Sequence, residues 1–320
     1  MVGIQKGKRE YSFSNDIQPD FSLKKEIIIQ LEADLPLIIQ GSARRDRIRR
    51  RSADFVQEIF FRRKVDRLME LARQAIMDAD ALGRAFPNGR IWWSRRLTAA
   101  RGRMKRKWQA DPGGIYLCLA LFPGLMEKNW QLYNIATGVS VCQIIREWGV
   151  GASIRWLNDI LIRGRKAGGI LAETLCTPGL GERYIIIGIG LNVNQEYFPE
   201  HLRSEATSLF LETGCEWPVI DLGRHIISRI AINFAILHEW EAGVLSEDIP
   251  PEQPSNVIRA FRALCHVENR RVRFGMDLEK GPGDPGTALG INKDGTLNLL
   301  LDDGNRIRIN TGEIRYEDEA

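Results

Sequence analysis

Two long apolar runs in the middle of the chain constrain its fold most. Ile115 to Phe122 reads IYLCLALF, and Arg183 to Asn194 reads RYIIIGIGLNVN. Apolar runs of this length are typical of strands that are buried on both faces of a sheet. Four shorter segments bounded by turn residues are also predicted to be strands: Arg90 to Ser94, Ser153 to Trp156, Asp159 to Arg163 and Ala167 to Leu175.

Helical periodicity occurs in three segments that flank these strands. Apolar residues recur three and four positions apart from Val65 to Ala79, from Gln131 to Trp148 and from Leu222 to Trp240. This spacing places an apolar stripe along each helix, which must pack against another element. The predicted fold class is therefore α+β, with a mixed sheet flanked by helices.

The two ends of the chain show other patterns. Beyond Arg270, short alternating segments are separated by Asp-Pro-Gly and Asp-Gly turns, the pattern of a small antiparallel barrel. Near the N-terminus no long periodic element stands out, and Pro36 interrupts the one apolar patch. We therefore expect an N-terminal extension of unclear structure over 1–50, a large domain that would hold the catalytic site over 51–269, and a small β-barrel domain over 270–320.

The composition excludes several classes of protein. The five cysteines have no Cys-x-x-Cys spacing, which argues against a disulfide framework and against a zinc site. No apolar run approaches the roughly 18 residues that a membrane span needs, and the N-terminus lacks the apolar core of a secretion signal. We therefore expect a cytoplasmic protein with no membrane contact and no protein metal site.

The first candidate motif is the basic run from Ala100 to Trp108, ARGRMKRKW. Guanidinium groups such as those of Arg101 and Arg103 offer planar forks to phosphate, and an indole can stack on a base. The run would therefore suit a nucleotide. The alternative is a basic surface loop without a ligand, and the run alone does not choose between them.

The second motif is RWLNDILIRGRKAGGIL, from Arg155 to Leu171. Backbone approaches a ligand closely at glycines such as Gly168 and Gly169, and Lys166 beside them would neutralise a carboxylate or a phosphate. An exposed hairpin with a lysine at its tip would give the same pattern.

The third motif is the end of the second apolar run, GIGLNVN, followed by Ala206 to Leu209, ATSL. Gly188 and Gly190 do not open a helix, so this is not a dinucleotide-binding fingerprint. Asn192 would either hydrogen-bond the edge of a base or cap the end of a strand.

In their order and spacing these motifs resemble the biotin protein ligase family. That family has a GRGRxGRxW loop, then KWPND with KxAGIL, then GIGxNxN, ATSL, and a small C-terminal barrel with GEI, which appears here at Gly312 to Ile314. The resemblance covers about Phe60 to Tyr316. It implies a core like that of the class II synthetases and an SH3-like C-terminal barrel.

The resemblance also implies a chemistry. Family members join the carboxylate of biotin to ATP with Mg²⁺, release pyrophosphate, and pass the acyl group to a lysine of a biotinyl or lipoyl-type carrier domain. The implied catalytic residues are Lys166, Arg103 and Asp159. The implied ATP and adenylate contacts are Arg101, Gly102, Arg106, Trp108, Asn158 and Asn192. A homodimer stays an open alternative.

The chain departs from the family where biotin itself is recognised. The Ser-Thr-Asn of the family is replaced by Arg67, Leu68 and Met69, and a glutamine before the basic loop by Leu97. With Gly168 and Gly169, these residues would form the acyl pocket. Apolar walls leave the polar atoms of a ureido ring unsatisfied, at roughly 1 to 3 kcal/mol for each group.

Three functions fit this mixture of matches and departures. The first is a biotin protein ligase with an altered pocket. The second is a ligase or transferase for a more apolar acid, such as a lipoyl or fatty acyl group. The third is a binding or regulatory protein without turnover, because Lys105 replaces a loop glycine. A nucleic-acid partner is not expected, since residues 1–50 show no helix-turn-helix pattern.

Overall fold

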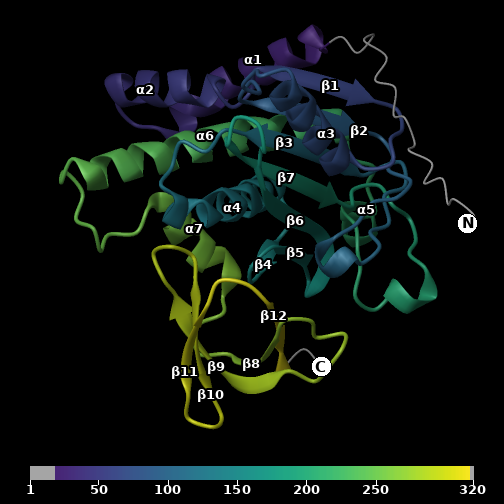
Figure 1. Cartoon of the computed structure of the whole chain (residues 1–320). Helices are drawn as coiled ribbons and strands as arrows, with labels where there is room; N and C mark the ends of the chain where they lie inside the picture. Colours follow the sequence, from purple (N-terminus) through teal and green to yellow (C-terminus); the bar gives the residue numbers. More distant parts are fainter. Residues whose placement is uncertain (1–18, 318–320) are drawn as a thin grey trace, which may run out of the picture.

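The computed structural model describes residues 19–317, and its centre is a seven-stranded mixed sheet (Figure 1). The strand order is β1-β2-β3-β7-β6-β5-β4, in which only the β1-β2 pair is parallel. The strands are β1 (Glu58–Arg62), β2 (Arg90–Ser94), β3 (Ile115–Leu121), β4 (Ala152–Arg155), β5 (Asp159–Ile162), β6 (Arg165–Cys176) and β7 (Arg183–Leu191).

Side chains of the central strands alternate between two apolar layers. In β3, Leu117 and Leu119 belong to the core that packs under α4 and α6, whereas Tyr116 and Cys118 belong to the smaller core under α3. Alternation follows from the two-residue repeat of a strand, and both faces are covered by helices. The strands predicted from the two long apolar runs are therefore present, and the structure buries them on both faces.

The three predicted helices are present and cover the two faces of the sheet. They are α3 (Leu68–Ala81), α4 (Gln131–Glu147) and α6 (Val219–Leu245). The helix α3 begins later than predicted because Val65 pairs with Leu97 in a β-bridge that prolongs the β1-β2 ladder. Two short helices were not predicted, α5 (Leu209–Thr213) and α7 (Asn256–Cys265).

The prediction that residues 1–50 contain no long periodic element is wrong for the part that the structure describes. The helices α1 (Phe21–Ile38) and α2 (Ser42–Ala53) pack against α6 (Figure 1). The stripe that sequence reasoning missed is spaced by four residues throughout and is fully buried: Leu23, Ile27, Leu31 and Leu35. Pro36 lies in the last turn of α1, where it does not stop the helix. Residues 1–18 of the predicted extension lie outside the described part.

The basic run in α2 is anchored to α6 rather than free. The guanidinium groups of Arg44 and Arg47 contact the Glu239 carboxylate at 2.7 and 3.3 Å. Ile48 fixes the helix from its buried face. This run is therefore partly a structural feature.

The C-terminal segment forms a second, antiparallel sheet with the order β11-β10-β9-β8-β12. Its strands are β8 (Arg271–Gly275), β9 (Asp284–Ile291), β10 (Leu297–Leu301), β11 (Arg306–Ile309) and β12 (Glu313–Tyr316). Gly295 and Gly304 adopt positive φ angles of 85° and 89° in the turns that the Asp-Gly pairs predicted. The predicted antiparallel domain is confirmed.

The domain divisions proposed from the sequence lie close to the ends of helices and strands. The helix α2 continues past residue 50 to Ala53, and β8 begins at Arg271, close to the division proposed at 269. None of the helices within residues 19–317 has the length and hydrophobicity needed to cross a bilayer.

The packing of α1 predicts that shortening a side chain on its buried face destabilises the protein. Leu31→Ala is expected to lower the free energy of unfolding by about 2 to 5 kcal/mol, because Leu31 is 1% exposed and its removal leaves a cavity. Leu37→Ala is the matched control, since Leu37 on the same helix is 85% exposed. Urea unfolding measures both; equal effects would show that α1 does not pack on the core.

Candidate active site

A strip of sheet without side chains lies next to Lys166 and is covered by Trp108 and Met69. Gly188 and Gly190 point to the α3 side of β7, and Gly169 of β6 is paired with Gly190. We call these three residues the glycine floor. A Cβ atom added at Gly190 would lie 2.8 Å from Nε1 of Trp108, and one added at Gly188 would lie 2.6 Å from Sδ of Met69. Only glycine lets these two side chains lie directly on the sheet.

Lys166 reaches the third glycine of this floor. Its Cε lies 3.5 Å from a Cβ placed at Gly169, and its Nζ lies 2.5 Å from Oδ1 of Asp159. The register of β5 and β6 shifts between Ile160 and Leu161, which marks a bulge that turns the Lys166 side chain out of the regular alternation.

The backbone of Lys166 is clamped by a neighbouring loop. Its N–H donates to the Glu205 carbonyl at 2.7 Å, and its carbonyl accepts from the Thr207 N–H at 2.9 Å. The ATSL motif therefore holds the lysine in place. Sequence reasoning found this motif but assigned it no role.

Asp159 is an electrostatic anchor. Its second carboxylate oxygen accepts from Arg155 at 2.8 Å. Burial alone would raise the pKa of Asp159, but the positive charges of Lys166 and Arg155 outweigh that effect and lower it. A carboxylate with a lowered pKa is a weak proton acceptor, so Asp159 is suited to hold Lys166 rather than to act as a general base.

Two asparagines border the same region. Asn158 donates from Nδ2 to the Ile170 carbonyl at 2.7 Å and accepts from Arg103 at 3.3 Å. Asn192 is 3% exposed and donates from Nδ2 to the Thr207 carbonyl at 3.0 Å, while its buried Oδ1 has no partner within the described residues. That oxygen is ready to accept a hydrogen bond from a ligand.

The basic loop is ordered by the C-terminal sheet. Arg103 donates to the Gly312 carbonyl at 2.7 Å. Lys105 has a φ angle of 61°, in the left-handed region where the related family has glycine. A non-glycine residue there costs roughly 1 to 2 kcal/mol, so the contacts with the C-terminal sheet must offset that cost.

Arg106 contacts carboxylates rather than open space. Its guanidinium binds Glu313 at 2.7 Å, Glu279 at 3.0 Å and Asp277. Burial opposes the charge of Arg106, but these carboxylates raise its pKa above its ordinary value. The expected phosphate contact of Arg106 therefore does not fit this conformation, in which the side chain latches the loop to the C-terminal sheet.

A cavity of about 780 Å³ lies between the core and the C-terminal sheet. It brings together seven of the nine residues predicted for catalysis and adenylate binding: Arg103, Arg106, Trp108, Asn158, Asp159, Lys166 and Asn192. Arg101 is exposed on the loop, and neither it nor Gly102 lines the cavity. Sequence reasoning did not find the carboxylates that bind Arg106, because Asp277 and Glu279 lie outside any motif.

The residues predicted for the acyl pocket are placed differently. Leu68 is buried in the core under α3, with Met69 and Leu97 packed against it, and Arg67 is half-buried and donates to the Ala99 carbonyl at 2.9 Å. None of these four lines the large cavity. A Cβ at Gly168 would meet the Gly190 carbonyl at 2.9 Å, so Gly168 serves close strand packing, whereas Gly169 belongs to the glycine floor.

The fold of this chain matches that of solved biotin protein ligases. The Aquifex aeolicus enzyme in complex with biotin and ATP aligns with a TM-score of 0.62 and 24% identity, over 81% of this chain and 98% of that one. A biotin protein ligase-like protein of unknown function from Silicibacter has a TM-score of 0.51 and 16% identity. These similarities show that the chain shares the α+β fold of these structures, with an antiparallel C-terminal sheet.

Sequence comparison finds similarity to biotin ligases. The model of the biotin/lipoate A/B protein ligase family matches residues 77–192. The bifunctional ligase/repressor BirA of Bacillus subtilis is 42% identical over 133 residues, which is 40% of each chain. The biotin--[acetyl-CoA-carboxylase] ligase of Mycobacterium tuberculosis is 28% identical over 76% of this chain and 86% of its own length. These comparisons show that the chain is similar to the biotin/lipoate A/B protein ligase family over residues 77–192 and to a biotin ligase over a longer part of its length.

The ion pairs of Arg106 with Asp277, Glu279 and Glu313, which we call the latch, predict how fast the backbone amides of the basic loop exchange. Arg106→Gln is expected to raise amide hydrogen exchange in residues 101–107 by about tenfold or more, because charged hydrogen bonds contribute roughly 1.5 to 3 kcal/mol each. Lys107→Gln is the control, since Lys107 is exposed. Mass spectrometry of the exchanged peptides measures both. Unchanged exchange in Arg106→Gln would mean that the loop is ordered by other contacts.

Proposed function

We propose that this chain is an ATP-dependent ligase that activates a carboxylic acid, biotin or a related acid, as an acyl-adenylate. The acyl group then passes to a lysine of a carrier domain. The observation that carries the proposal is the Lys166 ammonium, fixed 2.5 Å from Asp159 above the glycine floor and beside a large cavity.

The first step requires stabilisation of negative charge. A carboxylate oxygen attacks the α-phosphorus of ATP, a new O–P bond forms, and the bond to the β-phosphate breaks with release of pyrophosphate. An ammonium held in a fixed position stabilises the charge that develops on the phosphoryl oxygens. Lys166 meets this requirement because both its backbone and its side chain are held.

The adenosine would lie in the cavity with the basic loop. The unpartnered Oδ1 of Asn192 suits an exocyclic amino group of a base, and the half-buried indole of Trp108 offers a stacking surface. Arg103 is the loop guanidinium that faces both Asn158 and the C-terminal sheet. These residues support a nucleotide site in which the loop excludes water from the adenylate.

Mg²⁺ would enter with the nucleotide rather than bind a protein cage. Within residues 19–317 no group of three or more His, Cys, Asp or Glu side chains is placed to hold a metal ion. Magnesium in nucleotide sites is usually held by phosphate oxygens, waters and one or two carboxylates. The chemistry that it would supply is neutralisation of the triphosphate charge.

The relatives support a protein substrate. The name of the Mycobacterium tuberculosis relative specifies biotin and a carboxylase, which favours a carrier domain with an acceptor lysine for this chain. The aligned segments span only 40% of the length of the Bacillus relatives. The acceptor, the carrier type and a homodimer therefore stay predictions.

A second acid class is favoured by one observation. The Met69 thioether covers Gly188 at the end of the floor, and Leu68 and Leu97 lie in the same apolar cluster. An acid that reached this cluster would meet apolar side chains, against which a lipoyl or fatty acyl chain would lose no hydrogen bonds, whereas a ureido ring would lose roughly 1 to 3 kcal/mol for each unsatisfied group. We therefore propose an apolar acid as the alternative substrate.

Carboxylate-dependent exchange between ATP and pyrophosphate tests both candidates. With biotin, lipoate and octanoate offered separately, at least one acid is expected to support exchange, and Lys166→Ala is expected to reduce it by about 100-fold or more. Lys128→Ala is the control, because Lys128 is exposed and lies outside both cavities. If no acid supports exchange, a binding protein without turnover replaces the ligase.

A further inference from the structure

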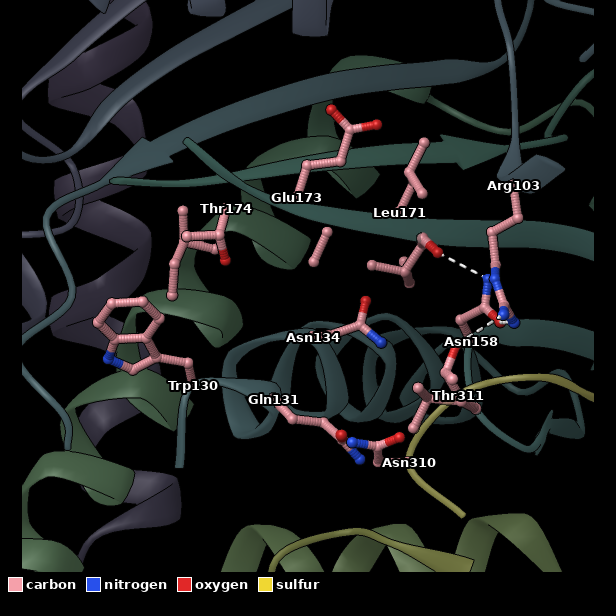
Figure 2. A pocket seen from close by; sticks show the side chains of 14 residues that line it. Arg103, Trp130, Gln131, Asn134, Asn158, Leu171, Glu173, Thr174, Asn310 and Thr311 are labelled. Carbon is pink, nitrogen blue, oxygen red and sulfur yellow. Dashed lines mark hydrogen bonds between the residues drawn. The ribbon is translucent and has the colours of Figure 1, made fainter. Parts of the chain in front are cut away.

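A second, smaller cavity of about 240 Å³ adjoins the large one (Figure 2). Two residues line both cavities, Arg103 and Asn158. The Arg103 guanidinium lies at the boundary, where it donates to Asn158 Oδ1 at 3.3 Å and to the Gly312 carbonyl at 2.7 Å. The small cavity is therefore a side chamber that ends beside the candidate adenylate site.

The outer end of this chamber lies at a free strand edge. The pairing of β5 with β6 ends at Asp159 and Gly169, and within residues 19–317 no other strand pairs with β6 on that side. Ala172 and Thr174 line the chamber there and are exposed. A group from outside the protein therefore has access to the chamber from this edge.

The chamber contains a buried amide without a partner. Asn134 of α4 is 7% exposed, and its Oδ1 has no hydrogen-bond partner within the described residues. Figure 2 shows this amide pointing from α4 into the middle of the cavity. One helical turn earlier, Nε2 of Gln131 is also buried and unpartnered. An unsatisfied buried polar group costs roughly 1 to 3 kcal/mol, which indicates that a hydrogen-bond donor of a ligand completes the Asn134 oxygen.

The other walls suit an alkyl chain. Trp130, Leu157, Ile170 and Ile185 supply apolar surface along the chamber. Apolar surface beside the acceptor oxygen of Asn134 fits a primary amine on a flexible methylene stem, which buries its stem and hydrogen-bonds its head. A lysine side chain has this chemistry.

We propose that the side chamber is the channel through which the acceptor lysine of the carrier reaches the acyl-adenylate. Asn134 accepts a hydrogen bond from the incoming amine, and Arg103 separates the channel from the adenylate until the amine arrives. This inference rests on the proposed ligase function and adds the route of its second substrate. Asn134 is a positioning residue, because it guides the amine and does not take part in the bond changes.

The transfer step balances without a further reagent. The lysine ammonium loses one proton to solvent, and its nitrogen attacks the carbonyl carbon of the adenylate. A C–N bond forms, the bond from that carbon to the phosphate oxygen breaks, and AMP leaves with the electron pair. The second nitrogen proton is then released to solvent, which leaves a neutral amide.

The test separates the two half-reactions in Asn134→Leu, which removes the acceptor oxygen and fills the channel. The amine probe is Nα-acetyl-lysine amide, and hydroxylamine is the small nucleophile that does not need an alkyl channel. Asn134→Leu is expected to raise KM for the lysine probe by about tenfold or more, as for one lost hydrogen bond. Exchange of ATP with pyrophosphate and the reaction with hydroxylamine should stay within about twofold of the parent chain.

Gln143→Leu is the matched control, an amide-to-leucine change on the same helix outside both cavities. It should leave all three rates unchanged, and thermal unfolding of both variants detects any loss of fold. Equal KM values for the lysine probe in the parent chain and Asn134→Leu, with exchange intact, would overturn the channel. Absence of exchange in the parent chain would instead refute the ligase function on which the channel rests.

Discussion

The ion pair between Lys166 and Asp159 is the contact on which the rest of the candidate site depends. A lysine beside two glycines has many rotamers and no preferred target, so its direction must come from its surroundings. Here the bulge in β6 aims it, the 205–207 segment holds its backbone, and Asp159 fixes its charge. Arg155 in turn keeps Asp159 ionised. Removing any of these groups would leave a charge without its counterpart in a half-buried place.

The C-terminal sheet completes this site from the opposite side. The basic loop contains a residue in left-handed backbone at Lys105, and isolated loops with such strain are rarely ordered. The carboxylates around Arg106 and the carbonyl of Gly312 supply the missing contacts. The small sheet is thus part of the cavity wall, and the loop joins two parts of the chain that lie about 200 residues apart.

Much of the central fold was predictable from the sequence, because buried strands appear as continuous apolar runs and amphipathic helices have a periodic apolar pattern. The stripe from Leu23 to Leu35 was missed, since Pro36 and scattered charges obscured its regular spacing. The grouping of Lys166, Asp159 and Arg103 followed from family motifs. The latch carboxylates and the Asn134 chamber did not, because they arise from contacts between distant segments. Contacts between distant segments produce no local pattern in the amino-acid sequence.

The central claim is that the residues around Lys166 recognise the adenylate half of an acyl-adenylate, and the alternative to biotin as its acid is an apolar one. Calorimetry with two stable acyl-adenylate mimics, octanoyl- and biotinyl-sulfamoyl adenosine, tests it most directly. Both should bind, since they share the adenosine half, and the octanoyl compound should bind about tenfold tighter or more, as expected for one or more unsatisfied polar groups. Tighter binding of the biotinyl compound would contradict the apolar alternative, and no binding of either compound would contradict the central claim.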